Sequence, residues 1–183
     1  MYFQQAGDRN TPTVIELAVQ RARELGIKEI VAPSNKGETA VALLDAAQGA
    51  CDIIIVTSHA GFNEPFVKLM PDGMQQQLTA RGAKVVRGAH ALSGVERSLA
   101  QKYGGTYPVL MMADTLRMFG QGTKVAVEIA VMAADAGVLS GNKVIALGGT
   151  HNGVDTALVL TPAHMNNFFD LKIHGVICKP FNF

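Results

Sequence analysis

Polar and glycine residues follow a short apolar run near the start of the chain, in a pattern that could bind an anion. The segment Lys28–Ala40 reads KEIVAPSNKGETA, in which Ile30–Ala32 suit a buried strand and Pro33 ends it. The turn-forming cluster Ser34–Gly37 comes next, and a helical pattern begins at Glu38. A helix N-terminus after such a turn gathers free N–H groups and positive partial charge. The pattern predicts either a phosphate site or an ordinary turn that binds nothing.

Polar or glycine-rich residues also follow three other expected strands. They are Thr57–His59, Ala89–His90 with Ser93–Gly94, and Gly148–Gly153. The carboxyl ends of parallel strands meet at one edge of a sheet, and α/β proteins bind their ligands beyond that edge. These strand ends are therefore where we expect a site.

The segment PAHMNNFF, residues 162–169, places two amides and a histidine beside two aromatic rings. Such a combination suits an aromatic heterocycle with polar edges. It equally suits a loop that buries Phe168 and Phe169 while the asparagines turn the backbone. Both interpretations stay open from the residues alone.

Several familiar signatures of catalysis and cofactor binding are missing. The sequence has no GxxxxGK[ST], GxGxxG, GxSxG or HExxH motif. Its five histidines are scattered, and none lies at metal-ligand spacing from a cysteine or carboxylate, so we expect no metal site. Glu128 and Asp135 lie seven residues apart on one helical stripe. We expect this stripe to be a thin solvent-facing edge rather than a pair of catalytic carboxylates.

The elements that must position these residues alternate between strands and helices. This alternation predicts an α/β fold, a three-layer α/β/α sandwich with a mostly parallel sheet. The close succession of the last three strands predicts an antiparallel edge. The helix that starts at Ser93 has capping-box spacing, and the helix over residues 123–136 is apolar nearly all round, as in a helix between layers. Helices are expected over residues 10–26, 38–48, 71–81, 93–103, 108–119 and 123–136, and strands over 30–32, 51–57, 83–87, 143–147, 155–160 and 173–178.

The composition predicts one globular domain over residues 1–183, because 48% of the residues are hydrophobic and 17% are charged. A net charge of +1 gives no electrostatic case for nucleic acid or a membrane surface. The N-terminus lacks the regions of a signal peptide, and the longest apolar stretch is too short to span a bilayer. We therefore expect a cytoplasmic protein.

The cysteines and the apolar helices give two further expectations. Cys51 and Cys178 form no C-x-x-C pair, so free thiols in a reducing compartment are expected, although a disulfide stays open. The apolar helical segments Val109–Phe119 and Val125–Met132 exceed what one modest sheet need cover. That excess predicts a homo-oligomer.

The chain resembles the C-terminal α/β domain of pyruvate kinase. The apolar strand, the Ser-x-x-Gly-x-Thr-Ala turn at Ser34–Ala40 and the strand IIIVT at Ile53–Thr57 carry this resemblance. Three longer motifs are similar to a stand-alone family of microbial proteins that share this fold and have no established reaction: LSGVERS at 92–98, IAVMAADAG at 129–137 and PAHMNNFFD at 162–170. The resemblance implies a pyruvate kinase C-terminal domain-like fold and bound flavin mononucleotide (FMN). The barrel and metal-binding carboxylates of pyruvate kinase are missing, so its activity is not implied.

Residues and resemblance together lead to one hypothesis, which is that the strand ends bind a phosphorylated planar ligand, FMN foremost. The alternative is a regulatory or sensing module that binds a sugar phosphate without chemistry. A third hypothesis is a hydrolase that uses His59 or His90 as its acid–base residue, although no nucleophile lies at a spacing that supports it. Whether the protein is an enzyme stays open. The expected phosphate-binding residues are Ser34, Asn35, Lys36, Gly37 and Thr39, flanked by Gly148, Gly149 and Thr150, with Thr57 and His59 as the floor and His164, Met165, Asn166 and Asn167 around the ring.

Overall fold

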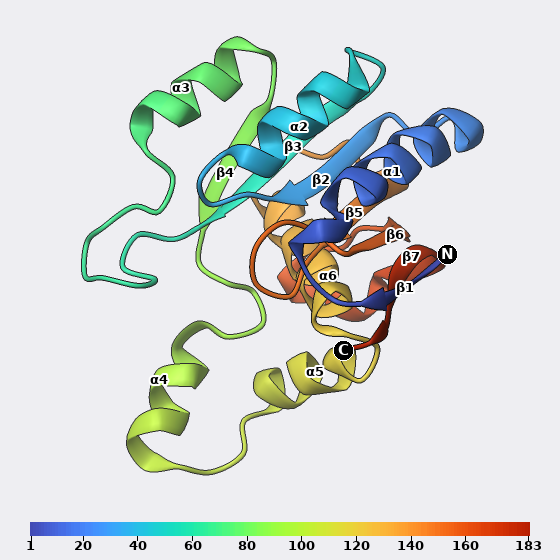
Figure 1. Cartoon of the computed structure of the whole chain (residues 1–183). Helices are drawn as coiled ribbons and strands as arrows, with labels where there is room; N and C mark the ends of the chain where they lie inside the picture. Colours follow the sequence, from blue (N-terminus) through green and yellow to red (C-terminus); the bar gives the residue numbers. More distant parts are fainter.

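A seven-stranded sheet runs through the middle of the molecule in the computed structural model, which describes all residues from 1 to 183 (Figure 1). The strand order is β1-β7-β6-β5-β2-β3-β4. Strands β5, β2, β3 and β4 are parallel, β6 is antiparallel to both of its neighbours, and β1 is parallel to β7. The predicted parallel sheet with an antiparallel edge is confirmed. The strands are β1 (Tyr2–Gln5), β2 (Glu29–Pro33), β3 (Asp52–Ser58), β4 (Lys84–Gly88), β5 (Val144–Gly148), β6 (Thr156–Thr161) and β7 (Lys172–Asn182).

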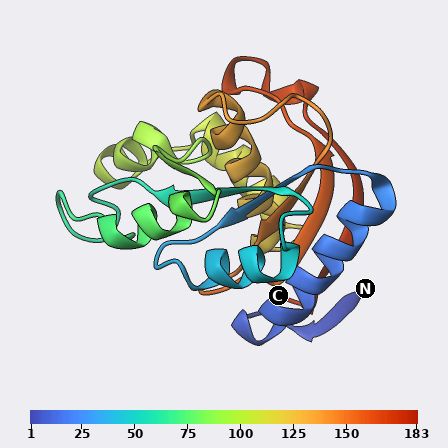
Figure 2. The ribbon, with the colours of Figure 1, turned by 90° about the horizontal axis from the view of Figure 1, so that it is seen from above.

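Helices cover both faces of the sheet, which confirms the three-layer sandwich. Helices α1, α2 and α3 lie on one face and α6 lies on the other (Figures 1 and 2). Helices α4 and α5 join β4 to α6, and α4 stands away from the sheet in Figure 1. The helices are α1 (Thr11–Leu25), α2 (Glu38–Ala47), α3 (Asp72–Ala80), α4 (Gly94–Tyr103), α5 (Pro108–Arg117) and α6 (Gln121–Asp135), with 3₁₀ turns η1 (Asp8–Asn10) and η2 (Met165–Asp170).

The apolar run of β2 shows why its sequence does not alternate between polar and apolar residues. Successive side chains of a strand point to opposite faces, and here each face has its own core. Ile30 and Ala32 pack into the core under α1 and α2, while Val31 packs into the core under α6. All three side chains are fully buried. A strand that is covered on both faces therefore needs apolar residues at every position.

Helix α6 is buried between layers as predicted, since twelve of its 15 residues are buried. The expectation of a thin solvent-facing edge is wrong for Glu128, which is only 4% exposed, whereas Asp135 is exposed. The apolar segment Val125–Met132 belongs largely to the second core of this chain. It therefore gives no argument for an oligomer.

Two local expectations differ from the structure at the chain's edges. Strand β1 is absent from the predicted elements because it has four residues and buries only Phe3. Helix α4 begins where expected, but the side chain of Ser93 makes no capping hydrogen bond. Short and exposed segments carry too little hydrophobic periodicity to be read from the sequence.

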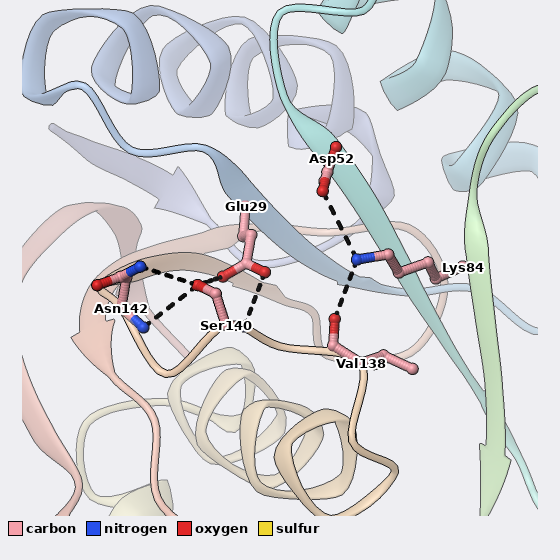
Figure 3. Close-up of polar contacts among 6 residues, drawn as sticks. All are labelled: Glu29, Asp52, Lys84, Val138, Ser140 and Asn142. Atoms are coloured by element: carbon pink, nitrogen blue, oxygen red, sulfur yellow. Dashed lines mark hydrogen bonds and ion pairs between the residues drawn. The ribbon is translucent and has the colours of Figure 1, made fainter.

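Polar contacts at the amino-terminal edge of the sheet hold the connection between α6 and β5 in place (Figure 3). The buried carboxylate of Glu29 accepts hydrogen bonds from the backbone N and the Oγ of Ser140, at 3.0 and 2.8 Å. Lys84 donates to the carbonyl of Val138 at 3.2 Å and lies 3.6 Å from a carboxylate oxygen of Asp52. These contacts fix where β5 starts beside β2.

Both cysteines are free thiols, which rules out the disulfide. Cys178 is buried, and this burial raises the pKa of its thiol to about 11, so it stays protonated at neutral pH. None of the helices combines the length and the apolar character needed to cross a bilayer.

Candidate functional site

The structure brings together the four strand ends that the sequence singled out. Strands β5, β2, β3 and β4 are neighbours and run in the same direction, so their carboxyl ends lie at one edge of the sheet. Ser34–Gly37 follows β2, His59 follows β3, His90 lies two residues after β4, and Gly149–Gly153 follows β5. We call this the carboxyl edge of the sheet.

Side chains within the β2–α2 turn fix its shape and attach it to β3. Ser34 Oγ accepts a hydrogen bond from the backbone N of Gly37 at 3.1 Å. The side-chain oxygen of Asn35 accepts hydrogen bonds from Thr57 Oγ1 at 3.2 Å and from the backbone N of Ser58 at 2.9 Å. Ser34, Asn35 and Thr57 therefore preorganise the turn through contacts within the protein.

Glycine is the residue that fits at position 37, for two independent reasons. Its φ of +103° lies in the left-handed region, which side chains with a Cβ rarely adopt. A Cβ at this position would also come within 2.5 Å of the Cγ and Sδ atoms of Met74. Met74 of α3 thus lies directly over the turn.

The first turn of α2 presents backbone donors that the protein leaves unused. The backbone N–H groups of Glu38, Thr39 and Ala40 have no hydrogen-bond partner, and the first bond within the helix is from Val41 N to Gly37 O, at 2.9 Å. These donors lie at the positive end of the helix dipole. Lys36 is exposed on the turn beside them. The arrangement can bind an anion.

Arg87, near the end of β4, adds a half-buried positive charge that the sequence analysis did not identify. It is paired in register with Thr57 of β3. Its Nη2 donates to the Met70 carbonyl at 3.3 Å and to Gln75 Oε1 at 3.2 Å, while its Nη1 is enclosed without a partner. A basic residue near the end of an apolar strand was the available signal.

Three aromatic side chains meet where β3 and β4 end. The ring centroids lie 5.4 Å apart for His59 and His90, 4.9 Å for Phe62 and His90, and 5.8 Å for His59 and Phe62. We call these residues the aromatic cluster. The Nδ1 atom of His59 lies 2.7 Å from the Ala60 carbonyl, which can only accept. That contact assigns the hydrogen to Nδ1 and leaves Nε2 free.

A buried ion pair lies behind the aromatic cluster. Lys124 and Glu128, one turn apart on α6, are paired and almost wholly buried, and Glu128 Oε1 accepts from the backbone N of Leu92 at 2.9 Å. Burial lowers the pKa of Lys124 and Glu128 opposes that shift. Burial also lowers the pKa of His90, so its ring is neutral at pH 7. The pair anchors the start of the chain that leads into α4.

Packing alone requires glycine at the end of β5 and at the position that follows it, whether or not a ligand binds there. A Cβ at Gly148 would lie 1.9 Å from the Gly122 carbonyl oxygen, and one at Gly149 would lie 2.3 Å from the Gly153 carbonyl oxygen. Thr150 Oγ1 donates to Asp155, a fully buried carboxylate, at 2.6 Å. Asp155 also accepts from Gly7 N and Thr156 Oγ1, at 3.1 and 2.9 Å.

The expected ring-binding residues lie at the opposite edge of the sheet. They follow β6, whose carboxyl end pairs beside the amino end of β5, because Leu160 is in register with Val144. The six residues of β6 separate them from the carboxyl edge by about 20 Å. The expectation that one ligand contacts both groups is therefore corrected, and the residues left out of the edge site are His164, Met165, Asn166 and Asn167.

The His164–Asn167 segment is instead held by contacts of its own. His164 Nδ1 lies 2.9 Å from Asp135 Oδ1, and Asn167 Oδ1 accepts from the backbone N of His164 at 3.1 Å. Phe168 packs against the core under α6, whereas Phe169 is 77% exposed. The backbone-turning interpretation thus holds for Asn167, and only one of the two phenylalanines joins the core.

The structure shows neither a metal-binding cluster nor a large surface groove at the carboxyl edge. No three histidine, cysteine or acidic side chains are grouped to hold a metal ion. Two grooves lie away from the carboxyl edge: one of about 410 Å³ follows α1, and one of about 370 Å³ lies between the end of α1 and strands β6 and β7. The carboxyl edge offers unused backbone donors, a half-buried arginine and aromatic rings.

A comparison with known protein families agrees with this architecture. Residues 12–160 match the description "Pyruvate kinase, alpha/beta domain". The matched range runs from α1 to the end of β6, and so includes the β2–α2 turn, Arg87 and the aromatic cluster. The chain therefore belongs to the family of the pyruvate kinase alpha/beta domain.

Proposed function

We propose that the carboxyl edge of β2, β3 and β4 binds the phosphate group of a small organic phosphate. The observation that carries this proposal is the set of unused N–H groups of Glu38, Thr39 and Ala40 at the start of α2. A helix N-terminus with free donors favours an anion through both hydrogen bonds and the helix dipole.

Arg87 supports the same proposal from a neighbouring part of the edge. A buried guanidinium nitrogen without a partner is destabilising by about 1–3 kcal/mol, and an anionic ligand would remove that penalty. Thr57 connects the two features, because it pairs with Arg87 in register and donates to Asn35 of the turn. Lys36 adds an exposed positive charge beside the donors.

The ligand that we propose to test first is FMN, a phosphorylated planar molecule. Two observations support FMN. The aromatic cluster lies at the same edge of the sheet, and the resemblance of the sequence to the stand-alone microbial family implies bound FMN. In this proposal the protein binds and orients the flavin, which supplies any redox chemistry. Free thiols at Cys51 and Cys178 fit a reducing compartment such as the cytoplasm.

A sugar phosphate is the second candidate, in a regulatory or sensing role. The donors of α2, Lys36 and Arg87 recognise phosphate whatever it is attached to, so they do not require an aromatic ring. This candidate predicts equal binding of ribose 5-phosphate and FMN.

Calorimetric titration with FMN and ribose 5-phosphate tests the phosphate proposal. We expect saturable binding that weakens at least tenfold in Arg87→Gln, because the substitution removes the charge while keeping a polar side chain. The matched control is Arg9→Gln, at an exposed position in η1, which should bind as the wild type does. Absence of binding by both ligands at millimolar concentration would refute the proposal.

A further inference from the structure

The aromatic cluster of His59, Phe62 and His90 lies at the surface and is not part of the hydrophobic core. Phe62 is 38% exposed and both histidines are half-buried, so the rings meet at the surface. The side chain of His90 makes no hydrogen bond, and that of His59 makes one, to its neighbouring carbonyl. Three rings that pack edge to face with open surfaces can accept a further flat ring.

The loop that carries Phe62 extends this aromatic surface. It joins β3 to α3, and a hydrogen bond from Gly61 N to Val67 O, at 3.0 Å, closes it. Phe66 at its tip is 96% exposed and has a φ of +63°, which is a strained conformation for a bulky residue. The structure thus holds two phenylalanines of one loop toward solvent beside the carboxyl edge.

The neutral state of His90 matters for what its ring can contact. His90 is backed by the Lys124–Glu128 pair, which is internally neutralised, and its own burial disfavours the protonated form. A neutral imidazole beside a phenyl ring offers a flat and weakly polar surface. The Nε2 atom of His59 has no partner within the protein and can hydrogen-bond to a polar group at the rim of such a surface.

The spacing of the strands sets how far this surface lies from the phosphate-binding turn. The turn follows β2 and His90 follows β4, with β3 between them. Adjacent strands lie about 4.8 Å apart, so strand spacing alone separates the two features by about 10 Å or more. A ligand that contacts both must therefore carry its phosphate and its ring on a linker of several bonds.

We propose that the aromatic cluster of His59, Phe62 and His90 binds the ring of an aromatic heterocycle whose phosphate, about 10 Å or more away, occupies the start of α2. This inference rests on the proposed function for the position of the phosphate. The ring-binding residues are then the aromatic cluster and not His164–Asn167. Ligands whose phosphate is attached next to the ring cannot contact both parts of the site.

Binding of five ligands to the full chain tests the two halves of this proposal separately. FMN and adenosine 5′-monophosphate carry ring and phosphate on a linker, pyridoxal 5′-phosphate has them close together, ribose 5-phosphate lacks the ring, and riboflavin lacks the phosphate. We expect FMN or adenosine 5′-monophosphate to bind at least tenfold more tightly than ribose 5-phosphate and pyridoxal 5′-phosphate. Phe62→Ala should remove that advantage and leave ribose 5-phosphate binding unchanged.

Matched variants and the remaining outcomes decide the interpretation. Met165→Ala, at the opposite edge, should bind all five ligands as the wild type does. Equal affinities for ring-bearing phosphates and ribose 5-phosphate, or an FMN affinity unchanged by Phe62→Ala, would overturn the ring site while leaving the phosphate proposal intact. Binding of riboflavin that Phe62→Ala weakens, without any binding of ribose 5-phosphate, would support the ring site and overturn the phosphate site. Binding by none of the five would overturn both.

Discussion

Gly37 is the residue on which the shape of the β2–α2 turn depends. Its positive φ and its contact with Met74 both exclude a side chain at this position. We predict that Gly37→Ala lowers the affinity for organic phosphates at least tenfold, because the α2 donors and Met74 must shift. Calorimetric titration measures this affinity.

The control for Gly37→Ala is Gly73→Ala, which adds the same methyl group at a position with open space in α3. That substitution should raise the free energy of unfolding by about 0.5–1 kcal/mol, because alanine favours the helix, and should leave phosphate binding unchanged. Equal phosphate affinities in the two variants would show that the turn geometry does not matter for binding.

The pKa of His90 gives a prediction for stability at mildly acidic pH. Burial lowers this pKa below its ordinary value of about 6.5, Glu128 opposes the shift, and Lys124, His59 and Arg97 add to it. The unfolded chain therefore takes up a proton at higher pH than the folded chain. His90 contributes its full stability above pH 6.5, and that contribution is lost as the pH falls below 6.5.

Urea unfolding at pH 7.5 and pH 5.0 checks this prediction. The loss of unfolding free energy between the two pH values should be smaller in His90→Phe than in the wild type. His151→Gln, at an exposed position, should behave as the wild type does. An unchanged loss in His90→Phe would contradict the burial of a neutral His90.

At the scale of residues, the sequence predicted the turn together with Thr57, His59 and His90, but it did not predict the role of Arg87 or the burial of Glu128. The turn at Ser34–Gly37 is predictable because turn-forming residues are a local signal in the sequence. Arg87 gave no such signal, because a basic residue at a strand end is ordinary until its partners are known. The burial of Glu128 was not predicted, because it pairs with Lys124 at a spacing of four residues on one helix. Ion pairs on exposed helix surfaces have the same spacing. Burial, which distinguishes the two, is a property of the packed fold.

At the scale of elements, the Lys124–Glu128 pair fixes α6 against the segment that leads into α4. We predict that Glu128→Gln destabilises the protein by about 3–5 kcal/mol, because it leaves the buried charge of Lys124 uncompensated. Chemical denaturation measures the change in unfolding free energy.

The double variant Lys124→Met/Glu128→Gln tests the reason for that loss. It removes the buried charge, and the glutamine oxygen can still accept from the backbone N of Leu92. We expect it to recover most of the stability that the single variant loses. A double variant as unstable as the single one would mean that charge burial is not the cause.

Helices and most strands were predictable because each carries its own pattern. The direction of β6 decides which residues reach the site. The short connections between the last three strands predicted an antiparallel edge, but they did not identify β6 as the strand that runs antiparallel to β5. Had β6 run parallel to β5, the segment after Thr161 would have reached the carboxyl edge. Its antiparallel pairing instead sends His164–Asn167 to the other end of α6, where His164 contacts Asp135. Strand pairing depends on contacts between residues that are far apart in the sequence. The prediction that His164–Asn167 share a ligand with the carboxyl edge was wrong for this reason.

At the scale of the whole molecule, the fold class followed from the alternation of elements, while the oligomeric state stays a prediction. Val125–Met132 packs largely into the core under α6, but Met111, Met118 and Phe119 of the α5 region are more than half exposed. Helix α4 buries none of its residues. Such apolar exposure is unusual for a monomer.

We therefore still predict a homo-oligomer. Light scattering on the purified chain at micromolar concentration should give a mass of at least twice 19.4 kDa. Met118→Lys should shift this equilibrium toward the monomer if the α5 region is covered in the oligomer. A wild-type mass of one chain would contradict the prediction.

The central claim is that the ligand lies at the carboxyl edge and not at the edge of His164–Asn167. Backbone amide resonances report both places in one experiment, with FMN and then ribose 5-phosphate added to the labelled protein. We expect saturable shifts for Glu38, Thr39 and Ala40 with both ligands, further shifts around Phe62 and His90 with FMN alone, and no shifts around Met165. Shifts confined to the Met165 region, or no shifts at all, would contradict it.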